Sequence, residues 1–263
     1  MKEPVAVVTG GAGFIGSTLA DLLIREGYSV VAIDNLSSGR KGNLRSAEET
    51  DESRFVFQEQ DICSPETTML IADFKPEVVF HLAAQADVRH SVADPVFDAE
   101  VNILGTLRVL EGARLSNARK VVVAASGGTL YGEPDSSFLP LKESLSPNPL
   151  SPYGASKAAM IYYLSVYHYL YGLDSTALAM ANVYGPRQSM SNVYTQIPTE
   201  FYKRNKFKLL NLNQLEDFTN ILKNPNLIAY LKNLNNFFEK KYLKDLDIIQ
   251  LEKYKMDIVF ILD

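Results

Sequence analysis

Residues 5–16 read VAVVTGGAGFIG, an apolar run followed at once by a glycine-rich turn. The glycines stand at positions 10, 11, 13 and 16, and the residues from Phe14 onward predict a helix. Such a turn lets the backbone approach a pyrophosphate closely, and the helix N-terminus offers free N–H groups and a partial positive charge to it. The stretch therefore predicts the start of a strand–turn–helix unit that binds a dinucleotide.

An acidic residue follows at the distance that such a unit requires. Asp34 ends the next apolar run, residues 29–34, about 20 residues after the glycines. A carboxylate there accepts hydrogen bonds from a ribose diol and repels a 2′-phosphate, so it favours NAD over NADP. Arg40 and Lys41 lie nearby, but we expect them to start the next helix.

The remaining apolar runs predict the fold class. Continuous runs of Val, Ile, Ala and Phe are typical of strands that are buried on both faces of a parallel sheet. Further strands are expected at residues 55–58, 78–82, 120–125 and 175–179, and helices at 14–26, 65–74, 96–115 and 152–171. This alternation predicts an α/β fold with a doubly wound parallel sheet, Rossmann-like, in which ligands bind at the carboxyl ends of the strands.

Bulk composition excludes several classes of protein. The chain has 263 residues, is 46% hydrophobic and has a formal net charge of −5 without clustered Lys and Arg, so we expect no nucleic-acid surface. Its single cysteine excludes an internal disulfide and fits a reducing compartment. No run is long enough to span a bilayer, and the N-terminal strand leaves no room for a signal peptide. We expect a cytoplasmic protein that binds no membrane.

The composition changes after Gln188. Residues 1–188 hold all fifteen glycines, with 15 basic and 22 acidic residues, whereas residues 189–263 hold no glycine, 11 basic and 9 acidic residues. We expect an NAD-binding Rossmann-like domain with the catalytic residues at 1–188. For residues 189–263 we expect a short, atypical, mostly helical lobe, either a fused or a truncated substrate lobe. A frameshifted reading and a lineage-specific ending fit the same composition.

The reactive pair is expected on the helix at 152–171. Tyr153 and Lys157 are four residues apart, which places both side chains on one helix face. A phenol titrates near pH 10 in water, and a neighbouring ammonium lowers its pKa toward the range of a useful base. The pair therefore predicts a proton acceptor for an alcohol beside a bound nicotinamide.

A hydroxyl group should assist this pair by bonding the substrate oxygen. Ser126, at the end of the strand expected at 120–125, is our candidate. The alternative is that Ser126 only caps or satisfies the turn before Gly127 and Gly128. Asp61 has two interpretations as well, since it either contacts an adenine ring or simply precedes a helix cap.

Together these residues resemble the extended short-chain dehydrogenases/reductases, in particular the NAD-dependent epimerase/dehydratase family and, within it, the UDP-glucose 4-epimerases. The resemblance covers about residues 3–188. Its motifs are TGGAGFIG at 9–16, DNLSSG at 34–39, HLAAQ at 81–85, SGGTLYG at 126–132, YGASK at 153–157 and NVYGPRQ at 182–188.

The resemblance implies a cofactor site. The pyrophosphate would be held by Gly10, Gly13, Phe14, Ile15 and Gly16, the adenosine ribose by Asp34, Asn35, Ser37, Ser38 and Gly39, and the adenine by Asp61 and Ile62. The cofactor channel would be lined by Leu82, Ala83, Ala84, Gln85 and Asn102. Lys157 would hold the nicotinamide ribose, Asn182 would contact the sugar nucleotide, and no metal is needed.

The reaction implied is 4-epimerisation of a UDP-sugar through a transient 4-keto sugar, with Tyr153 as base and Ser126 polarising the oxygen, in a homodimer. Alternatives on the same scaffold are a sugar-nucleotide 4,6-dehydratase, a decarboxylase, and an inactive NAD-binding module with a replaced lobe. The dehydratases usually carry an Asp-Glu pair where this chain has Gly127 and Gly128. Many family members also carry the loop hydroxyl at the position of Gly127, so Thr129 is a second candidate for the role of Ser126.

Overall fold

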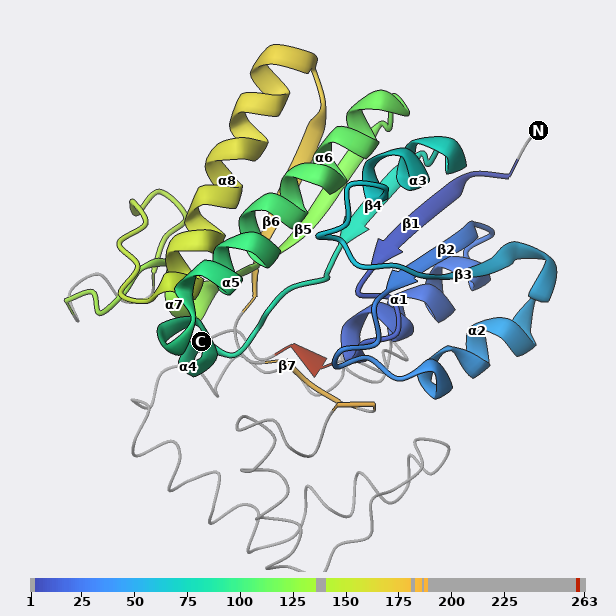
Figure 1. Ribbon diagram of the computed structural model, residues 1–263, viewed down its shortest axis with the longest axis horizontal. Coiled ribbons are helices and arrows are strands. Elements are labelled where there is room, and N and C mark those ends of the chain that lie inside the picture. Colours follow the sequence, from blue (N-terminus) through green and yellow to red (C-terminus); the bar gives the residue numbers. More distant parts are fainter. Residues whose placement is uncertain (1–2, 136–140, 181–182, 186, 189–258, 261–263) are drawn as a thin grey trace, which may run out of the picture. The chain divides into compact units, whose positions relative to one another are not determined.

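The computed structural model describes residues 3–135, 141–180, 183–185, 187–188 and 259–260 (Figure 1). The chain divides into two compact units, Met1–Val183 with Phe260–Asp263, and Tyr184–Val259. Nearly all described residues belong to the first unit. The helical lobe expected after Gln188 lies outside the described residues.

The first unit is built on a parallel sheet of six strands in the order β3-β2-β1-β4-β5-β6. The strands are β1 (Val5–Thr9), β2 (Ser29–Asp34), β3 (Phe55–Glu59), β4 (Val78–His81), β5 (Lys120–Ser126) and β6 (Asp174–Met180). Since β1 pairs with both β2 and β4, the strand order reverses beside β1. This is the doubly wound topology that the sequence predicts, and its crevice lies between the carboxyl ends of β1 and β4.

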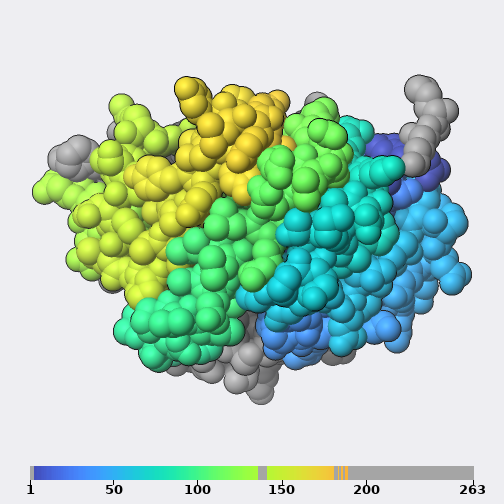
Figure 2. Space-filling model, turned by 45° about the horizontal axis from the view of Figure 1, so that its top comes forward, coloured from blue at the N-terminus to red at the C-terminus, as the bar shows by residue number. Residues whose placement is uncertain are grey.

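Helices cover both faces of this sheet (Figure 1). On one face lie α3 (Thr67–Phe74), α6 (Thr106–Leu115) and α8 (Pro152–Tyr171), whose apolar residues pack on the sheet in one core cluster. On the other face α1 (Phe14–Arg25) and α2 (Arg45–Thr50) pack on the sheet in a second cluster. Figure 2 looks toward the first face, where α8 in yellow, α6 in green and α3 in teal lie side by side.

Shorter elements make up the rest of the described secondary structure. They are the 3₁₀ turns η1 (Lys41–Leu44) and η2 (Glu52–Arg54), the helices α4 (Val88–Ala93), α5 (Pro95–Ala99) and α7 (Gly127–Leu130), the π-helical turn η3 (Glu100–Gly105), and the strands β7 (Val183–Tyr184) and β8 (Val259–Phe260). Among the described residues, no helix is both long and apolar enough to cross a membrane.

Helix α8 has the end signals that its sequence predicts. Ser151 is the N-cap, and its Oγ accepts a hydrogen bond from the Gly154 N–H at 3.1 Å. Pro152 stands at the first helical position, where no N–H is required. Gly172 ends the helix with φ +68°, a left-handed conformation that glycine adopts without strain. These caps fix the start of α8, and with it the position of Tyr153.

The helix expected at residues 96–115 differs from the prediction, because the structure divides it into α5, η3 and α6. The π-helical turn holds Asn102, whose Oδ1 accepts from Gln85 N at 3.1 Å and whose Nδ2 donates to Gln85 O at 2.9 Å. The wider π-helical turn accompanies the pairing of Asn102 with Gln85 in the loop after β4. The spacing of apolar residues does not predict this pairing.

His81 joins three elements inside the sheet's first face. Its Nδ1 lies 2.7 Å from Thr9 Oγ1 and its Nε2 lies 2.9 Å from Thr106 Oγ1. Thr106 donates its own hydroxyl proton to Asn102 O at 2.7 Å, so it accepts from His81 Nε2–H and leaves Nδ1 to accept from Thr9. Burial, aided by the charge of Lys157, lowers the pKa of His81 to about 3.

This histidine predicts an acid-dependent loss of stability. The pKa of His81 is depressed in the folded state, so below about pH 6.5 the unfolded chain gains a proton that the folded chain refuses. The free energy of unfolding should fall by up to about 1.4 kcal/mol per pH unit as the pH drops below 6.5, until the folded pKa is reached. Urea unfolding between about pH 7 and about pH 4.5 measures this fall.

The variant His81→Gln should flatten that dependence, whereas His90→Gln, a change at an exposed histidine, should leave it as in the unmodified chain. Equal acid sensitivity in His81→Gln and the unmodified chain would show that His81 is not the group responsible.

Candidate active site

The glycine turn after β1 meets the loop after β4 at the point where the strand order reverses. Gly10 has φ +68°, and a Cβ at this position would lie 2.7 Å from Ala83 N and 2.9 Å from the carbonyl carbon of Leu82. Only a residue without a side chain allows the two loops to come this close. Leu82 N donates to Thr9 O at 3.1 Å, which continues the pairing of β1 and β4 to this edge.

The start of α1 is shaped for a close backbone approach. Gly13 N donates to Gly10 O at 3.1 Å, and a Cβ on Gly16 would collide with Gly10 O. No side chain caps α1, which leaves the N–H groups around Phe14 and Ile15 for an anion. The five residues predicted to hold a pyrophosphate therefore lie together in one turn, which we call the glycine cradle. Its free N–H groups and its glycines, which lack side chains, suit a pyrophosphate.

Asp34 lies beside the same turn, nearly buried at the carboxyl end of β2. Its Oδ2 accepts from Ala12 N at 3.0 Å and its Oδ1 accepts from Leu36 N at 2.8 Å. Each carboxylate oxygen has two lone pairs, so each keeps an acceptor position for a diol. A Cβ on Gly39 would lie 2.8 Å from Asp34 Oδ1, so Gly39 keeps this carboxylate uncrowded. The arrangement fits a ribose.

Asn35 and Asp61 are joined across the ends of β2 and β3. Asn35 Nδ2 donates to Asp61 Oδ2 at 2.8 Å, and Asn35 Oδ1 accepts from Ser37 N at 3.0 Å. Asp61 Oδ1 also accepts from Cys63 N at 2.7 Å. Partial burial opposes ionisation of Asp61, but these hydrogen bonds outweigh it and hold its pKa below the usual value. Asp61 therefore shapes the turn before α3, as the second interpretation expects, while its contact with an adenine ring stays a prediction.

Ile62 and the Ser37–Ser38 pair differ in their surroundings. Ile62 is 6% exposed and packs against η3, where a Cβ on Gly105 would lie 2.8 Å from its Cδ1. Ser37 and Ser38 are exposed. Ser37 and Ser38 are therefore open to a ligand through their side chains, while most of Ile62 belongs to the core. Asn182 lies outside the described residues.

Tyr153 and Lys157 share one face at the start of α8. Lys157 Nζ lies 5.6 Å from the centroid of the Tyr153 ring and donates to Ala124 O, on β5, at 2.9 Å. Lys157 is only 4% exposed, and burial lowers its pKa to about 8, although the negative charge of Asp98 opposes this effect. An ammonium group that titrates close to neutral pH is therefore held against the phenol ring.

Ser126 ends β5, and its side chain does not cap α7. The capping alternative is thus not what the structure contains. The hydroxyl of Thr129 is buried and makes no hydrogen bond with any described residue. At Gly127 a Cβ would lie 3.0 Å from Ala179 O of β6, which gives a packing reason for glycine at this position. Both Ser126 and Thr129 remain candidates for the polarising group.

Several buried polar residues around this site were given no individual role in the sequence analysis. Thr9, Thr106 and Ser91 are fully or almost fully buried, as are Asp98 and Ser156. Asp98 lies four residues before Asn102, a spacing that places both on one helix face, but its burial in an otherwise exposed segment is seen only in the structure. No three His, Cys, Asp or Glu side chains gather as a metal site in the part of the chain that is described.

Comparison with known proteins identifies the family of this chain. A family model described as GDP-mannose 4,6-dehydratase matches residues 7–231. The UDP-glucose 4-epimerase of Mycolicibacterium smegmatis is 54% identical over 182 residues, which covers 69% of this chain and 57% of that protein. The UDP-glucose 4-epimerase of Thermotoga maritima, solved with UDP-glucose, has a TM-score of 0.66 at 44% identity, covering 72% of this chain and 59% of that chain.

A third relative was solved as a complex with NAD. The UDP-glucose 4-epimerase of Thermus thermophilus has a TM-score of 0.67 at 41% identity, covering 74% of this chain and 60% of that chain. The chain thus spans somewhat more than half the length of the relatives it matches. Because the family model matches most of the chain, the protein belongs to the GDP-mannose 4,6-dehydratase family of NAD-dependent epimerases and dehydratases.

Proposed function

We propose that the protein is an NAD-dependent UDP-sugar 4-epimerase of the UDP-glucose/UDP-galactose type. The observation that supports this most strongly is the buried Lys157 on α8, with its Nζ 5.6 Å from the Tyr153 ring, in a fold whose first strand leads into the glycine cradle. An ammonium this close favours the phenolate form of the tyrosine. Tyr153 is then suited to take the proton from the 4-hydroxyl of a sugar.

NAD is the cofactor that these residues fit. The pyrophosphate would lie on the turn from Gly10 to Gly16, the adenosine ribose beside Asp34 and Asn35, and the nicotinamide ribose beside Lys157. When bound, NAD supplies reversible oxidation at carbon 4 of the sugar. The protein's share is to hold the sugar oxygen between the Tyr153 phenol and a hydroxyl from Ser126, which steadies the charge that develops on that oxygen.

The substrate class follows from relatives and from the loop after β5. The Thermotoga maritima epimerase was solved with UDP-glucose and the Thermus thermophilus epimerase with NAD, which supports a UDP-hexose here. A 4,6-dehydratase would need acidic side chains at Gly127 and Gly128. Since Gly127 has the Ala179 carbonyl oxygen only 3.0 Å from where a Cβ would stand, a side chain there is disfavoured. Epimerisation, which needs no further acid, fits better than dehydration.

A homodimer is part of the proposal. Apolar side chains on α8 are exposed at helical spacing, namely Tyr162, Val166, Tyr169 and Leu170, at 63%, 46%, 87% and 57%. Helix α6 and the turn before it expose Leu104 and Leu115, at 49% and 45%. These two helices lie side by side on the face seen in Figure 2, and a second copy would cover both stripes. We further infer that the dimer works in the cytoplasm, where the free Cys63 would stay reduced.

The cofactor part is tested at Asp34. The variant Asp34→Asn keeps the shape of the side chain but loses the charge that repels a 2′-phosphate. It should bind NAD about tenfold more weakly and discriminate less against NADP. Isothermal titration with both nucleotides measures this, with Asp73→Asn, an exposed acid on α3, as the control. Unchanged NAD affinity in Asp34→Asn would remove Asp34 from the site.

The chemistry is tested at Tyr153. Incubation of the protein with NAD and UDP-glucose should yield UDP-galactose, and Tyr153→Phe should lower this turnover at least about 100-fold while NAD is still bound. The matched control is Tyr169→Phe, which removes the same atom from an exposed position of the same helix. Absence of UDP-galactose in the unmodified protein would leave an NAD-binding module, and normal turnover in Tyr153→Phe would exclude its role as base.

The assembly is tested by sedimentation. The unmodified protein should sediment as a dimer, and Val166→Glu should convert it to a monomer because a charge enters the apolar stripe. Leu22→Glu, a change of the same kind on α1 at 45% exposure, should leave the dimer intact. A monomer in the unmodified protein, or equal effects of the two variants, would contradict this interface.

A further inference from the structure

Asp98 is the most deeply buried acid near the proposed site, with 0% exposure. It lies in α5, and its hydrogen bonds with described residues involve neither the glycine turn nor the loop after β5. Burying a carboxylate costs several kcal/mol unless hydrogen bonds and an opposite charge compensate it. The groups that compensate Asp98 therefore reveal what this carboxylate holds in place.

Three side chains from three elements donate to it. Its Oδ1 accepts from Gln85 Nε2 at 3.0 Å and from Asn102 Nδ2 at 2.9 Å, and its Oδ2 accepts from Ser156 Oγ at 2.7 Å. Gln85 follows β4, Asn102 lies in the π-helical turn, and Ser156 directly precedes Lys157 on α8. The carboxylate thus joins the predicted cofactor channel to the helix of the reactive pair.

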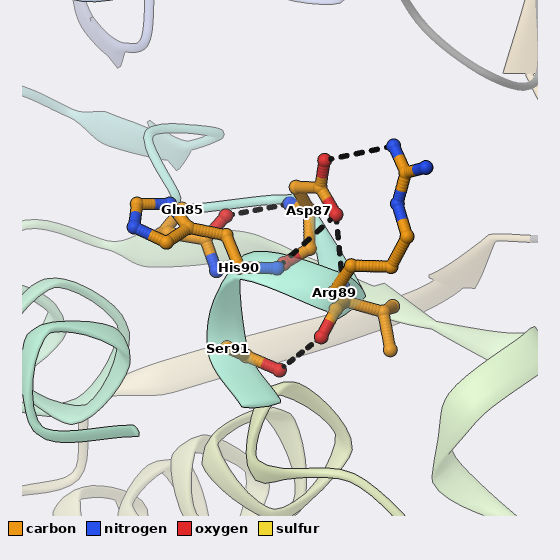
Figure 3. Close-up of polar contacts among 6 residues, drawn as sticks. Gln85, Asp87, Arg89, His90 and Ser91 are labelled. Carbon is orange, nitrogen blue, oxygen red and sulfur yellow. Dashed lines mark hydrogen bonds and ion pairs between the residues drawn. The ribbon is translucent and has the colours of Figure 1, made fainter. Parts of the chain in front are cut away.

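A second route leads from Gln85 to Tyr153, and Figure 3 shows its part from Gln85 to Ser91. Gln85 Oε1 accepts from Asp87 N at 2.6 Å, and Asp87 Oδ1 caps α4 by accepting from Arg89 N at 2.8 Å. Further along α4, Ser91 Oγ donates to the carbonyl of Val88 at 2.7 Å. The same Oγ accepts from the backbone N–H of Tyr153 at 3.2 Å. Asp98 therefore reaches one end of the reactive pair through Ser156 and the other through Gln85 and α4.

The charge of Asp98 faces one buried cation. Among the described residues Asp98 forms no ion pair shorter than 4 Å, and its negative charge raises the pKa of Lys157 against the effect of burial. Within the described part of the chain, Lys157 also faces the phenol of Tyr153 and the imidazole of His81. His81 is neutral above about pH 3, so Asp98 is the counter-charge that favours a protonated Lys157.

We propose that Asp98 is a positioning residue of the active site: its carboxylate fixes Gln85, Asn102 and Ser156 and keeps the buried Lys157 ammonium charged. The catalytic consequence rests on the proposed function, because a charged Lys157 matters to turnover only if Tyr153 is the base. The hydrogen bonds of Asp98 and its effect on the charge of Lys157 do not depend on the proposed function. Both parts can be measured separately.

The variant Asp98→Asn separates charge from shape. The amide keeps an oxygen for Gln85 and Asn102, and its NH₂ can donate to the Ser156 hydroxyl. The titration of Lys157 is read by NMR of protein labelled with ¹³C at the lysine ε-carbons, and Lys157→Met assigns the signal by its loss. The midpoint should be near 8 in the unmodified protein and shift to lower pH in Asp98→Asn. Glu100→Gln, which removes an exposed charge two residues away, should cause no shift.

The epimerase pH profile is the second readout. The alkaline limb of kcat should move to lower pH in Asp98→Asn, in parallel with the Lys157 midpoint, and stay in place in Glu100→Gln. An unshifted Lys157 midpoint in Asp98→Asn overturns the proposal. A shifted midpoint in a protein without epimerase activity supports the role of Asp98 and overturns the proposed function instead.

A double variant covers the case in which Asp98→Asn does not fold. If the defect is an uncompensated Lys157 charge, Asp98→Asn combined with Lys157→Met should fold, and a double variant that also fails to fold would contradict the proposal. Where Asp98→Asn does fold, urea unfolding should give a smaller cost for this change in the Lys157→Met background, and an equal cost in both backgrounds would mean that the two charges are not coupled.

Discussion

The close approach of two backbone loops at Gly10 is the constraint on which the site depends. Because a Cβ at Gly10 would lie 2.7 Å from Ala83 N, the loops after β1 and β4 can meet only at a glycine. The His81 imidazole, bonded to Thr9 and Thr106, fixes the same edge from inside the sheet. The crevice at the strand-order reversal therefore has a rigid floor, on which the uncapped start of α1 can receive an anion.

The proposed chemistry at Tyr153 depends on the charges of two buried groups, Lys157 and Asp98. Burial removes most of the hydration of Lys157 and lowers its pKa, which favours the neutral amine. The negative charge of Asp98, which accepts hydrogen bonds from three side chains, raises that pKa and so favours the ammonium. Asp98 lies on α5 and Lys157 lies on α8. The packing of these two helices therefore brings two opposite charges into the same buried region. A site that needs an ammonium next to a phenol thereby depends on an acid that contacts no ligand itself.

Local patterns predicted the strands, the cradle and the Tyr153–Lys157 pair, because each depends on residues close together in sequence. The limits of α8 were predictable from Ser151, Pro152 and Gly172, whose capping roles are local. The π-helical turn around Asn102 and the role of Asp98 were not, since both depend on partners in other elements, such as Gln85 and Ser156. The roles of Ser126 and Thr129 stayed open because a hydroxyl gives no periodic signal.

The account's central claim is that the nicotinamide end of NAD reaches the phenol of Tyr153. A crystal structure of the protein with NAD tests it most directly. We predict the nicotinamide ring beside the Tyr153 hydroxyl, with Lys157 Nζ in hydrogen-bonding distance of the adjoining ribose. A nicotinamide position filled by protein atoms, or a Tyr153 hydroxyl directed away from the ring, would contradict the account.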